Sequence, residues 1–201
     1  MIKVLGIAAS PRRGGNSDIL LDEVLKGAAE GGAADVEKLI VSSLNISPCT
    51  ECNSCSATGK CIIKDDMQMI YQKLFEADRI ILATPVFFAT VSTHAKILID
   101  RCQALWAKKY LLGHTHKKEC PSINREGMLV SVAAAKGPTV FDCVKKTAKY
   151  FFLAIGADYK HNLLYNNIEE KGSIKKHHSA LKEAFEKGKD LADKRGAILI
   201  L

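Results

Sequence analysis

Four of the seven cysteines in this sequence stand close together and form a group that could do chemistry. The pattern is C-x2-C-x2-C-x5-C, and the four residues are Cys49, Cys52, Cys55 and Cys61. Nothing at the N-terminus resembles a secretory signal, so we expect a cytoplasmic chain in which disulfides have little use. A tight group of thiols in such a chain indicates metal or redox chemistry.

The spacing of the four cysteines favours a [4Fe–4S] cluster over a zinc ion. Structural zinc sites usually draw two close pairs of ligands with about a dozen or more residues between them. Here three cysteines come at steps of three, and the fourth follows the short segment Ser56–Lys60. Such a short loop can offer one thiolate to each iron, as compact ferredoxin runs do. The fourth cysteine is further away than in the usual ferredoxin run, so zinc, and cysteines without metal, remain as alternatives.

A second group of chemically competent residues is the segment Ser10–Ser17, which reads SPRRGGNS. It combines hydroxyls, an amide, two arginines and two glycines between a strand and a helix. Free backbone N–H groups and the helix dipole at such a place suit a phosphate. The segment matches neither GxGxxG nor the Walker pattern. The alternative is a plain turn in which Asn16 or Ser17 caps the helix.

A third segment, Thr84–Thr93, is apolar and aromatic where a surface loop should be polar. Pro85 stiffens it, and Phe87 and Phe88 lie where a flat ring could pack. The alternative is a buried loop that fills the core under a helix. In the helix that follows, we expect Arg101 to be a surface or salt-bridge residue.

Alternating strands and helices must position these three segments. The expected strands are Lys3–Ala9, Asp35–Val41, Arg79–Thr84, Met128–Ala135 and Asp158–Leu164, and the expected helices are Asn16–Glu30, Asp65–Phe75, Thr93–Tyr110, Pro138–Ile155 and Ser173–Arg195. This alternation predicts an α/β fold with a parallel five-stranded sheet, doubly wound and covered on both faces. Ligands in such sheets bind beyond the carboxyl ends of the strands.

Length and composition are those of one globular domain over residues 1–201. The chain has a net charge of +7 and is 47% apolar and 25% charged, which excludes a disordered or fibrous chain. Its apolar runs are too short to span a membrane. The positive charge either serves solubility or attracts anions, but without a long basic arm we expect no nucleic-acid partner. The sequence ends in AILIL, an apolar tail that indicates packing on the domain or on a second copy.

Three motifs in order resemble a known family. The run SPRRGGNS resembles the phosphate loop of the NADPH-dependent FMN reductase branch of the flavodoxin-like superfamily, and TPVFFATVSTHAKILIDR resembles its isoalloxazine loop and following helix. With CTECNSCSATGKC between them, the chain is similar to iron–sulfur flavoproteins. The resemblance implies a flavodoxin-like sheet of order 2-1-3-4-5, with a cysteine-rich loop at about 47–64. The basic segment at about 113–126 matches no motif of that family.

The resemblance also assigns residues to the cofactors. The FMN phosphate would be held by Ser10, Arg12, Asn16 and Ser17. The flavin ring would be bordered by Pro85, Val86, Phe87, Phe88 and Thr90. A third wall would be formed by Ala133, Ala134, Ala135 and Gly137. The family tends to be oligomeric, so we expect a homodimer or homotetramer.

The function predicted from these segments is electron transfer by FMN and a [4Fe–4S] cluster. The donor would be a one-electron carrier such as ferredoxin, or NAD(P)H, and the acceptor a small molecule. FMN passes electrons singly or in pairs and a cluster singly, so one chain with both converts between the two kinds of carrier. The first alternative is an NAD(P)H-dependent FMN or quinone reductase without a cluster. The second is a zinc module that binds nucleic acid.

Overall fold

A computed structural model of the chain describes residues 2–33, 35–114, 125–137 and 139–193. Five strands form a parallel sheet: β1 (Lys3–Ala8), β2 (Asp35–Ile40), β3 (Arg79–Phe87), β5 (Glu126–Val132) and β6 (Asp158–Tyr165). Their order is β2-β1-β3-β5-β6. The predicted fold class and strand order are therefore confirmed. A short strand, β4 (Thr90–Val91), was not predicted and pairs antiparallel with β3.

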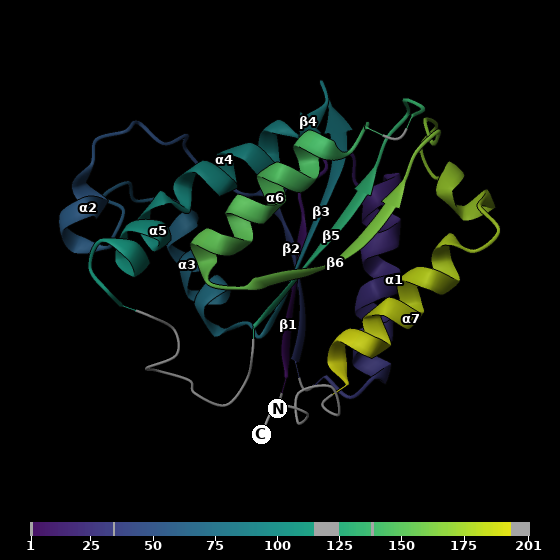
Figure 1. Ribbon diagram of the computed structural model, residues 1–201, viewed down its shortest axis with the longest axis horizontal. Helices are drawn as coiled ribbons and strands as arrows, with labels where there is room; N and C mark the ends of the chain where they lie inside the picture. The colour runs from purple at the N-terminus through teal and green to yellow at the C-terminus, as the bar shows by residue number, and fades with distance from the viewer. Residues whose placement is uncertain (1, 34, 115–124, 138, 194–201) are drawn as a thin grey trace.

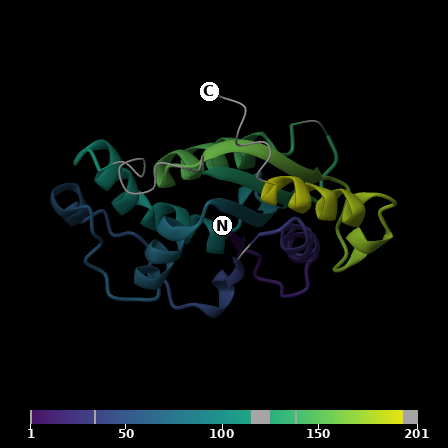
Figure 2. The same cartoon turned by 90° about the horizontal axis from the view of Figure 1, so that it is seen from below.

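Helices cover both faces of this sheet (Figures 1 and 2). They are α1 (Asn16–Glu30), α2 (Ser54–Thr58), α3 (Met67–Glu76), α4 (Thr93–Arg101), α5 (Gln103–Tyr110), α6 (Asp142–Ile155) and α7 (Ala180–Ala192), with 3-10 turns η1 at Val41–Ser43 and η3 at Ser173–Lys176. One apolar core joins the sheet to α3, α4 and α6, and the other joins it to α1 and α7. The central strands β1, β3 and β5 are buried on both faces, as expected of a parallel sheet, whereas the edge strands β2 and β6 are partly exposed.

Two of the predicted helices are interrupted in the structure. The helix expected over Thr93–Tyr110 breaks at Cys102, because the hydroxyl of Tyr71 donates a 2.7 Å hydrogen bond to the carbonyl of Arg101. A side chain that takes a carbonyl out of the helical ladder is a common cause of such a break. The helix expected over Ser173–Arg195 is divided into η3 and α7.

Strand β3 also runs further than expected, through Pro85 to Phe87. Its pairing with β1 ends at Ala83, so Pro85 lies beyond the last residue pair on that side. There the missing N–H of proline removes no bond of that ladder. The basic segment and the C-terminal AILIL tail lie largely outside the described residues. In the described part of the chain, no helix is long and apolar enough to cross a membrane.

Helices α1 and α7 come from opposite ends of the chain and cross at two glycines. A Cβ atom on Gly27 would lie 1.9 Å from the carbonyl oxygen of Phe185, and one on Gly188 would lie 2.0 Å from that of Val24. The two helix backbones therefore touch directly. This contact fixes α1 against α7. The phosphate-loop segment directly precedes α1, so its position is fixed as well.

Buried Arg125 ties two helices of the other face together at their C-terminal ends. Its guanidinium donates to the carbonyls of Leu74 in α3 and Ile155 in α6, and to Ala77 at 2.9 Å. Burial lowers the pKa of Arg125 to about 10. Its bonds satisfy carbonyl groups that a helix end otherwise leaves without a partner.

We expect Gly27→Ala and Gly188→Ala each to destabilise the protein by about 2–3 kcal/mol, because the added methyl must push two backbones apart. Urea unfolding measures the effect. Lys187→Ala, on the exposed side of α7, is the control and should change stability by less than about 0.5 kcal/mol. If the glycine variants are as stable as this control, the close crossing is wrong.

Candidate functional site

The four clustered cysteines lie on a loop between η1 and α3. Cys49 and Cys52 are exposed, while Cys55 and Cys61 are half-buried. All four line one hollow of about 430 Å³, together with residues of α4 and α5. The chain curls tightly to do this: Gly59 has φ +67°, and a Cβ there would press on Lys108 at 3.1 Å. Figure 1 shows α2 beside α5 at one side of the molecule.

The cysteine thiols are close enough to affect one another. Burial raises the pKa of Cys55, and the neighbouring Cys61, Cys49 and Cys52 raise it further by repulsion. Hydrogen bonds from the backbone and hydroxyl of Ser54 lower the pKa of Cys52. The predicted metal ligands therefore meet around one space. Within the described ranges, no three His, Cys, Asp or Glu side chains are arranged to hold a single metal ion.

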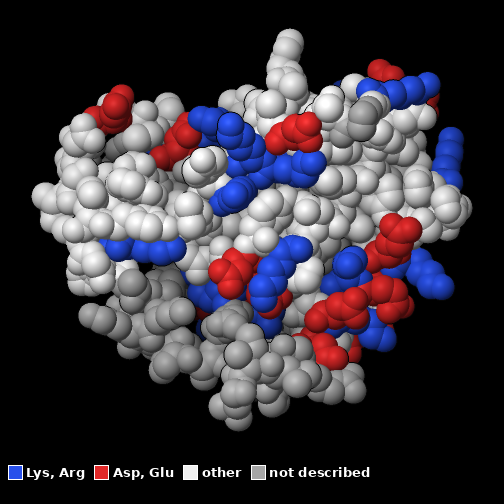
Figure 3. Space-filling view, in the orientation of Figure 1, with Lys and Arg blue, Asp and Glu red and all other residues white. Residues whose placement is uncertain are grey.

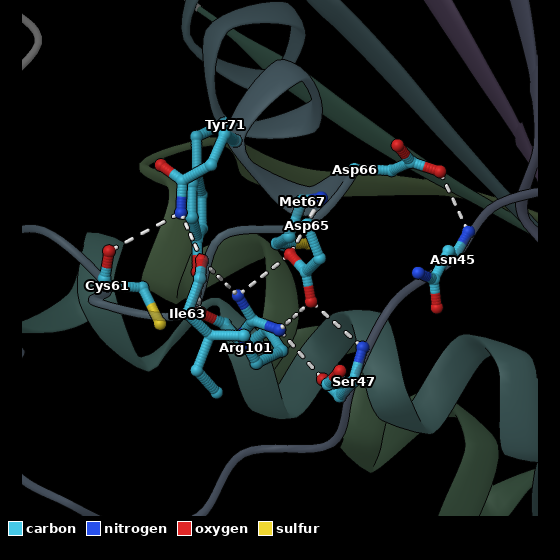
Figure 4. A network of polar contacts seen from close by, with 10 residues as sticks. Asn45, Ser47, Cys61, Ile63, Asp65, Asp66, Met67, Tyr71 and Arg101 are labelled. Carbon is cyan, nitrogen blue, oxygen red and sulfur yellow. Dashed lines mark hydrogen bonds and ion pairs between the residues drawn. The ribbon is translucent and has the colours of Figure 1, made fainter.

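A buried ion pair closes the base of this loop (Figure 4). Arg101 Nη1 lies 2.6 Å from Asp65 Oδ2, and Nη2 lies 3.1 Å from Oδ1. The side chain of Arg101 is 0% exposed and that of Asp65 is 3% exposed. Both residues also bond the loop ends, since Arg101 Nη1 donates to the carbonyl of Ser47 at 2.7 Å and Asp65 Oδ2 accepts from the N–H of Ser47 at 2.9 Å.

Neighbouring residues complete this neck, by which we mean the paired segments 45–47 and 65–66. The N–H of Asn45 donates to Asp66 Oδ2 at 2.8 Å, and the N–H of Asp66 returns a bond to the carbonyl of Asn45. Gln68 donates to the carbonyls of Ile63 and Cys61. The position of the fourth cysteine is thus linked to the first turn of α3.

The network shifts the pKa values of its charged members in the direction that keeps them charged. Burial acts to raise the pKa of Asp65, but hydrogen bonds from Arg101, Ser47 and Met67 outweigh it and lower the pKa. Burial acts to lower the pKa of Arg101, but its bond to Asp65 and the charges of Tyr71 and Cys61 raise it. The influence of Cys61 on Arg101 connects the ion pair to the cysteine hollow.

The phosphate-loop segment lies at the carboxyl end of β1, where the fold places ligand sites. Ser10 is buried, and its Oγ accepts a hydrogen bond from the backbone N–H of Arg12 at 3.1 Å. The side chain of Arg12 is exposed. Helix α1 begins at Asn16 without a side-chain cap, so the alternative that Asn16 or Ser17 caps it is wrong. Ser17 is buried.

Asn16 has another role in this segment. Its side-chain amide donates to the carbonyl of Glu170 at 2.8 Å and accepts from the N–H of Ile174 at 3.2 Å. Asp18 also stabilises the loop. Its carboxylate accepts a hydrogen bond from the N–H of Gly14 at 2.7 Å and forms an ion pair with Lys38 at 2.6 Å. Sequence reasoning missed this brace, although Asp18 stands in the first turn of the helix.

The predicted ring segment is a hairpin between β3 and β4. Val86 pairs with Val91, and Phe87 with Thr90. The two turn residues have positive φ, 45° for Phe88 and 62° for Ala89. Positive φ at both turn positions fits the twist of a two-residue hairpin but is strained for residues other than glycine or asparagine. Phe88 is fully exposed at the tip, so the alternative of a buried filler loop fails for this residue.

Ser92 joins this hairpin to the neighbouring segments. It is buried, donates to the carbonyl of Ala9 at the end of β1, and accepts from the N–H of Ala95 as the N-cap of α4. Its own N–H donates to Thr84 at 3.0 Å. The ring segment is therefore joined by one buried hydrogen bond to Ala9, the residue directly before the phosphate segment.

The third predicted wall follows β5. Ala133 is buried and pairs with the loop after β6, through bonds to Tyr165 and Ile168. Ala134 and Ala135 are exposed, and Gly137 has φ +122°. The predicted flavin-binding residues thus fall in three segments, one after β1, one in the hairpin of β3 and β4, and one after β5, at one edge of the sheet.

Comparison with known proteins identifies the family. A model of the NADPH-dependent FMN reductase family matches residues 2–141. The chain belongs to this family, as the motifs led us to expect.

Among curated proteins, it is similar to an iron-sulfur flavoprotein of Methanocaldococcus jannaschii, with 43% identity over 104 residues, which cover 52% of this chain and 53% of that one. An iron-sulfur flavoprotein of Archaeoglobus fulgidus is 41% identical over 100 residues, or 50% and 45% of the two chains. The matches span about half the length of these relatives. They confirm the likeness to iron–sulfur flavoproteins.

Solved structures share the fold. A flavone reductase aligns with a TM-score of 0.73 and 21% identity, over 96% of this chain and 62% of that one. The NAD(P)H:quinone oxidoreductase from Methanothermobacter marburgensis aligns with a TM-score of 0.67 and 13% identity, over 96% of each chain.

Asp65→Asn removes the charged partner of buried Arg101 and should cost about 3–5 kcal/mol of stability at pH 7. Because folding lowers the pKa of Asp65, its charged carboxylate stabilises the protein fully above the unfolded value near 4. That stabilisation is lost as the pH falls through the lower folded value. Urea unfolding at a series of pH values should therefore show the two proteins converging below about pH 4.

Asp100→Asn is the matched control, since Asp100 forms an exposed ion pair with Lys96 on α4. Such pairs contribute about 0–1 kcal/mol. A cost for Asp65→Asn no larger than that of this control would contradict the role of the neck.

Proposed function

We propose that this chain is an FMN-dependent redox protein that also holds a [4Fe–4S] cluster. The observation that carries the proposal is the hollow lined by Cys49, Cys52, Cys55 and Cys61 in a chain of the FMN reductase family. Four thiols around one space match the thiolate donor set of such clusters. Bound together, FMN and the cluster would exchange electrons between one-electron and two-electron carriers.

In this proposal the four cysteine thiolates hold the cluster and the neck keeps the loop in place. The N-terminus of α1 and the side chains of Ser10 and Arg12 bind the FMN phosphate. The hairpin between β3 and β4 and the segment Ala133–Gly137 border the ring. The tie from Ser92 to Ala9 keeps the hairpin in register with the phosphate loop.

The proposed donor is a one-electron carrier such as ferredoxin, or NAD(P)H, and the proposed acceptor is a small molecule. The names of the relatives support a redox role, and the +7 net charge favours an acidic partner or an anionic cofactor. In the view of Figure 3, uncharged residues cover much of the face over α5, whereas charges of both signs gather over α7.

We propose that the protein acts as a homodimer or homotetramer in the cytoplasm.

A second candidate is an NAD(P)H-dependent FMN or quinone reductase without a cluster. The description of the matching family as NADPH-dependent favours it. Protein that oxidises NADPH with FMN bound, and that contains no iron after anaerobic reconstitution, would support this candidate over the first.

Cys52→Ala should abolish cluster binding while FMN binding is retained, because the flavin segments lie on other loops. We expect about four irons and four labile sulfides per chain in the parent protein, with a broad absorbance near ~400 nm. Iron and sulfide analysis after anaerobic reconstitution measures this. Cys143→Ala, at an exposed cysteine of α6, is the control and should bind the cluster normally. Stoichiometric zinc, or no metal, in the parent protein would refute the cluster.

Arg12→Ala should weaken FMN binding by roughly tenfold or more, because loss of a charge-assisted hydrogen bond costs about 1.5–3 kcal/mol. Quenching of flavin fluorescence measures the affinity. Riboflavin, which has no phosphate, should bind the variant and the parent equally. Arg13→Ala removes the same charge one residue further on and should have the smaller effect. Equal losses in both variants would mean a general charge effect and no phosphate contact at Arg12.

A further inference from the structure

The charge of Arg101 has two neighbours of different kinds. On one side it is paired with Asp65 in the neck. On the other it lines the hollow that the four cysteines surround. The ion pair alone would explain an anchor for the loop, but an anchor does not need to face the cysteine hollow.

One atom of this side chain is left over by the network. Nη1 and Nη2 together bond Asp65, Ser47 and Ile63. Nε is buried and has no hydrogen-bond partner among the residues that the structure describes. A buried N–H without a partner is costly, so such a group indicates a role outside the protein's own hydrogen bonds.

Three charged residues line the hollow, and Arg101 is the buried one. The other charged lining residues are Glu51 and Asp100, and both are exposed to solvent. Solvent and salt screen exposed charges, whereas a charge in a buried position acts over a longer distance. The guanidinium is therefore the least screened charge on the lining of the hollow, with the carboxylate of Asp65 beside it.

We propose that Arg101 sets the reduction potential of the metal centre held by the cysteine loop, in addition to anchoring that loop. The inference rests on the proposed function, because it requires a cluster on the four cysteines. One-electron reduction, by an external reductant such as dithionite, adds one negative charge to the centre. A buried positive charge beside it stabilises the reduced form and raises the potential, and Asp65 offsets part of this effect. Charge and hydrogen bonding are general determinants of cluster potentials.

Three variants of the reconstituted protein separate charge from anchoring. Arg101→Gln and Asp65→Asn break the same ion pair, but the first makes the local charge one unit more negative and the second one unit more positive. Arg101→Lys keeps the charge and loses the planar fork. The potential is measured by redox titration with dithionite, followed by electron paramagnetic resonance. Lys145→Gln, in an exposed ion pair on α6, is the control for a charge change far from the hollow.

We expect Arg101→Gln to lower the potential and Asp65→Asn to raise it, each by at least a tenfold change in the ratio of reduced to oxidised centre. For a one-electron step this is 59 mV. Arg101→Lys should lie closer to the parent than Arg101→Gln, and Lys145→Gln should match the parent. An anchoring role alone would move both pair-breaking variants in the same direction, because both loosen the neck.

The outcomes separate this inference from the proposed function. If the parent protein binds no iron and sulfide, the proposed function fails and the inference fails with it. If the parent loads but Arg101→Gln and Asp65→Asn shift together or not at all, only the inference is overturned. Should one of these two not load, Arg101→Lys compared with the other decides in the same way. If none of the three variants loads, the pair is an anchor only and the proposal is wrong.

Discussion

The loop that carries the cysteines depends on one buried guanidinium–carboxylate pair. Removing two charges from water costs several kcal/mol per ion, and this is recovered only if the pair is well formed and its other hydrogen-bonding groups are used. Arg101 and Asp65 meet most of that condition by bonding the backbone at Ser47 and Ile63, and only Nε of Arg101 has no partner among the described residues. Since these bonds hold both ends of the loop, the charge pair and the four thiols keep a fixed relation to one another.

The flavin segments depend on a different kind of constraint, the burial of small polar groups between strands. Ser92 bonds Ala9 and Ala95 from the end of the hairpin, and Ser131 donates to the carbonyl of Thr84 at 2.8 Å. These bonds join the carboxyl ends of β1, β3 and β5, where a doubly wound sheet binds its ligands. The strained turn at Phe88 and Ala89 is held by this support, because strain of that size persists only where neighbouring contacts impose it.

Buried apolar runs that alternate with amphipathic helices were sufficient to predict the five parallel strands, and the family resemblance supplied their order. It was not sufficient for β4, since a strand of two residues has no periodic pattern. The break at Cys102 was missed because apolar residues continue in register across it, and its cause, the hydroxyl of Tyr71, comes from another helix. Arg101 was expected to be a surface or salt-bridge residue, and it does form an ion pair, but in a buried position. Its burial depends on Asp65, 36 positions away, and no local pattern reports a partner at that distance.

The residues proposed for the flavin were named from motifs, and their role stays a prediction. Asn16 differs from the others because its side-chain amide already forms hydrogen bonds with Glu170 and Ile174. No motif near residue 16 could indicate this contact. The neck shows the same limit of local patterns. The sequence indicated Asp65 as the start of a helix, but not its bond to Ser47, which closes the cysteine loop. Sequence patterns thus indicated the candidate residues, while the contacts that orient them come from residues distant in the chain.

The crossing of α1 and α7 at Gly27 and Gly188 has a consequence for how the protein matures during synthesis. Helix α1 leaves the ribosome well before α7, which packs on its backbone and is the last of the described helices. Until α7 emerges, the apolar side of α1 that includes Val24 and Ala28 lacks part of its cover. The cover of α1 is therefore complete only after α7 has been synthesised, and a product that stops before α7 would expose apolar surface that chaperones bind.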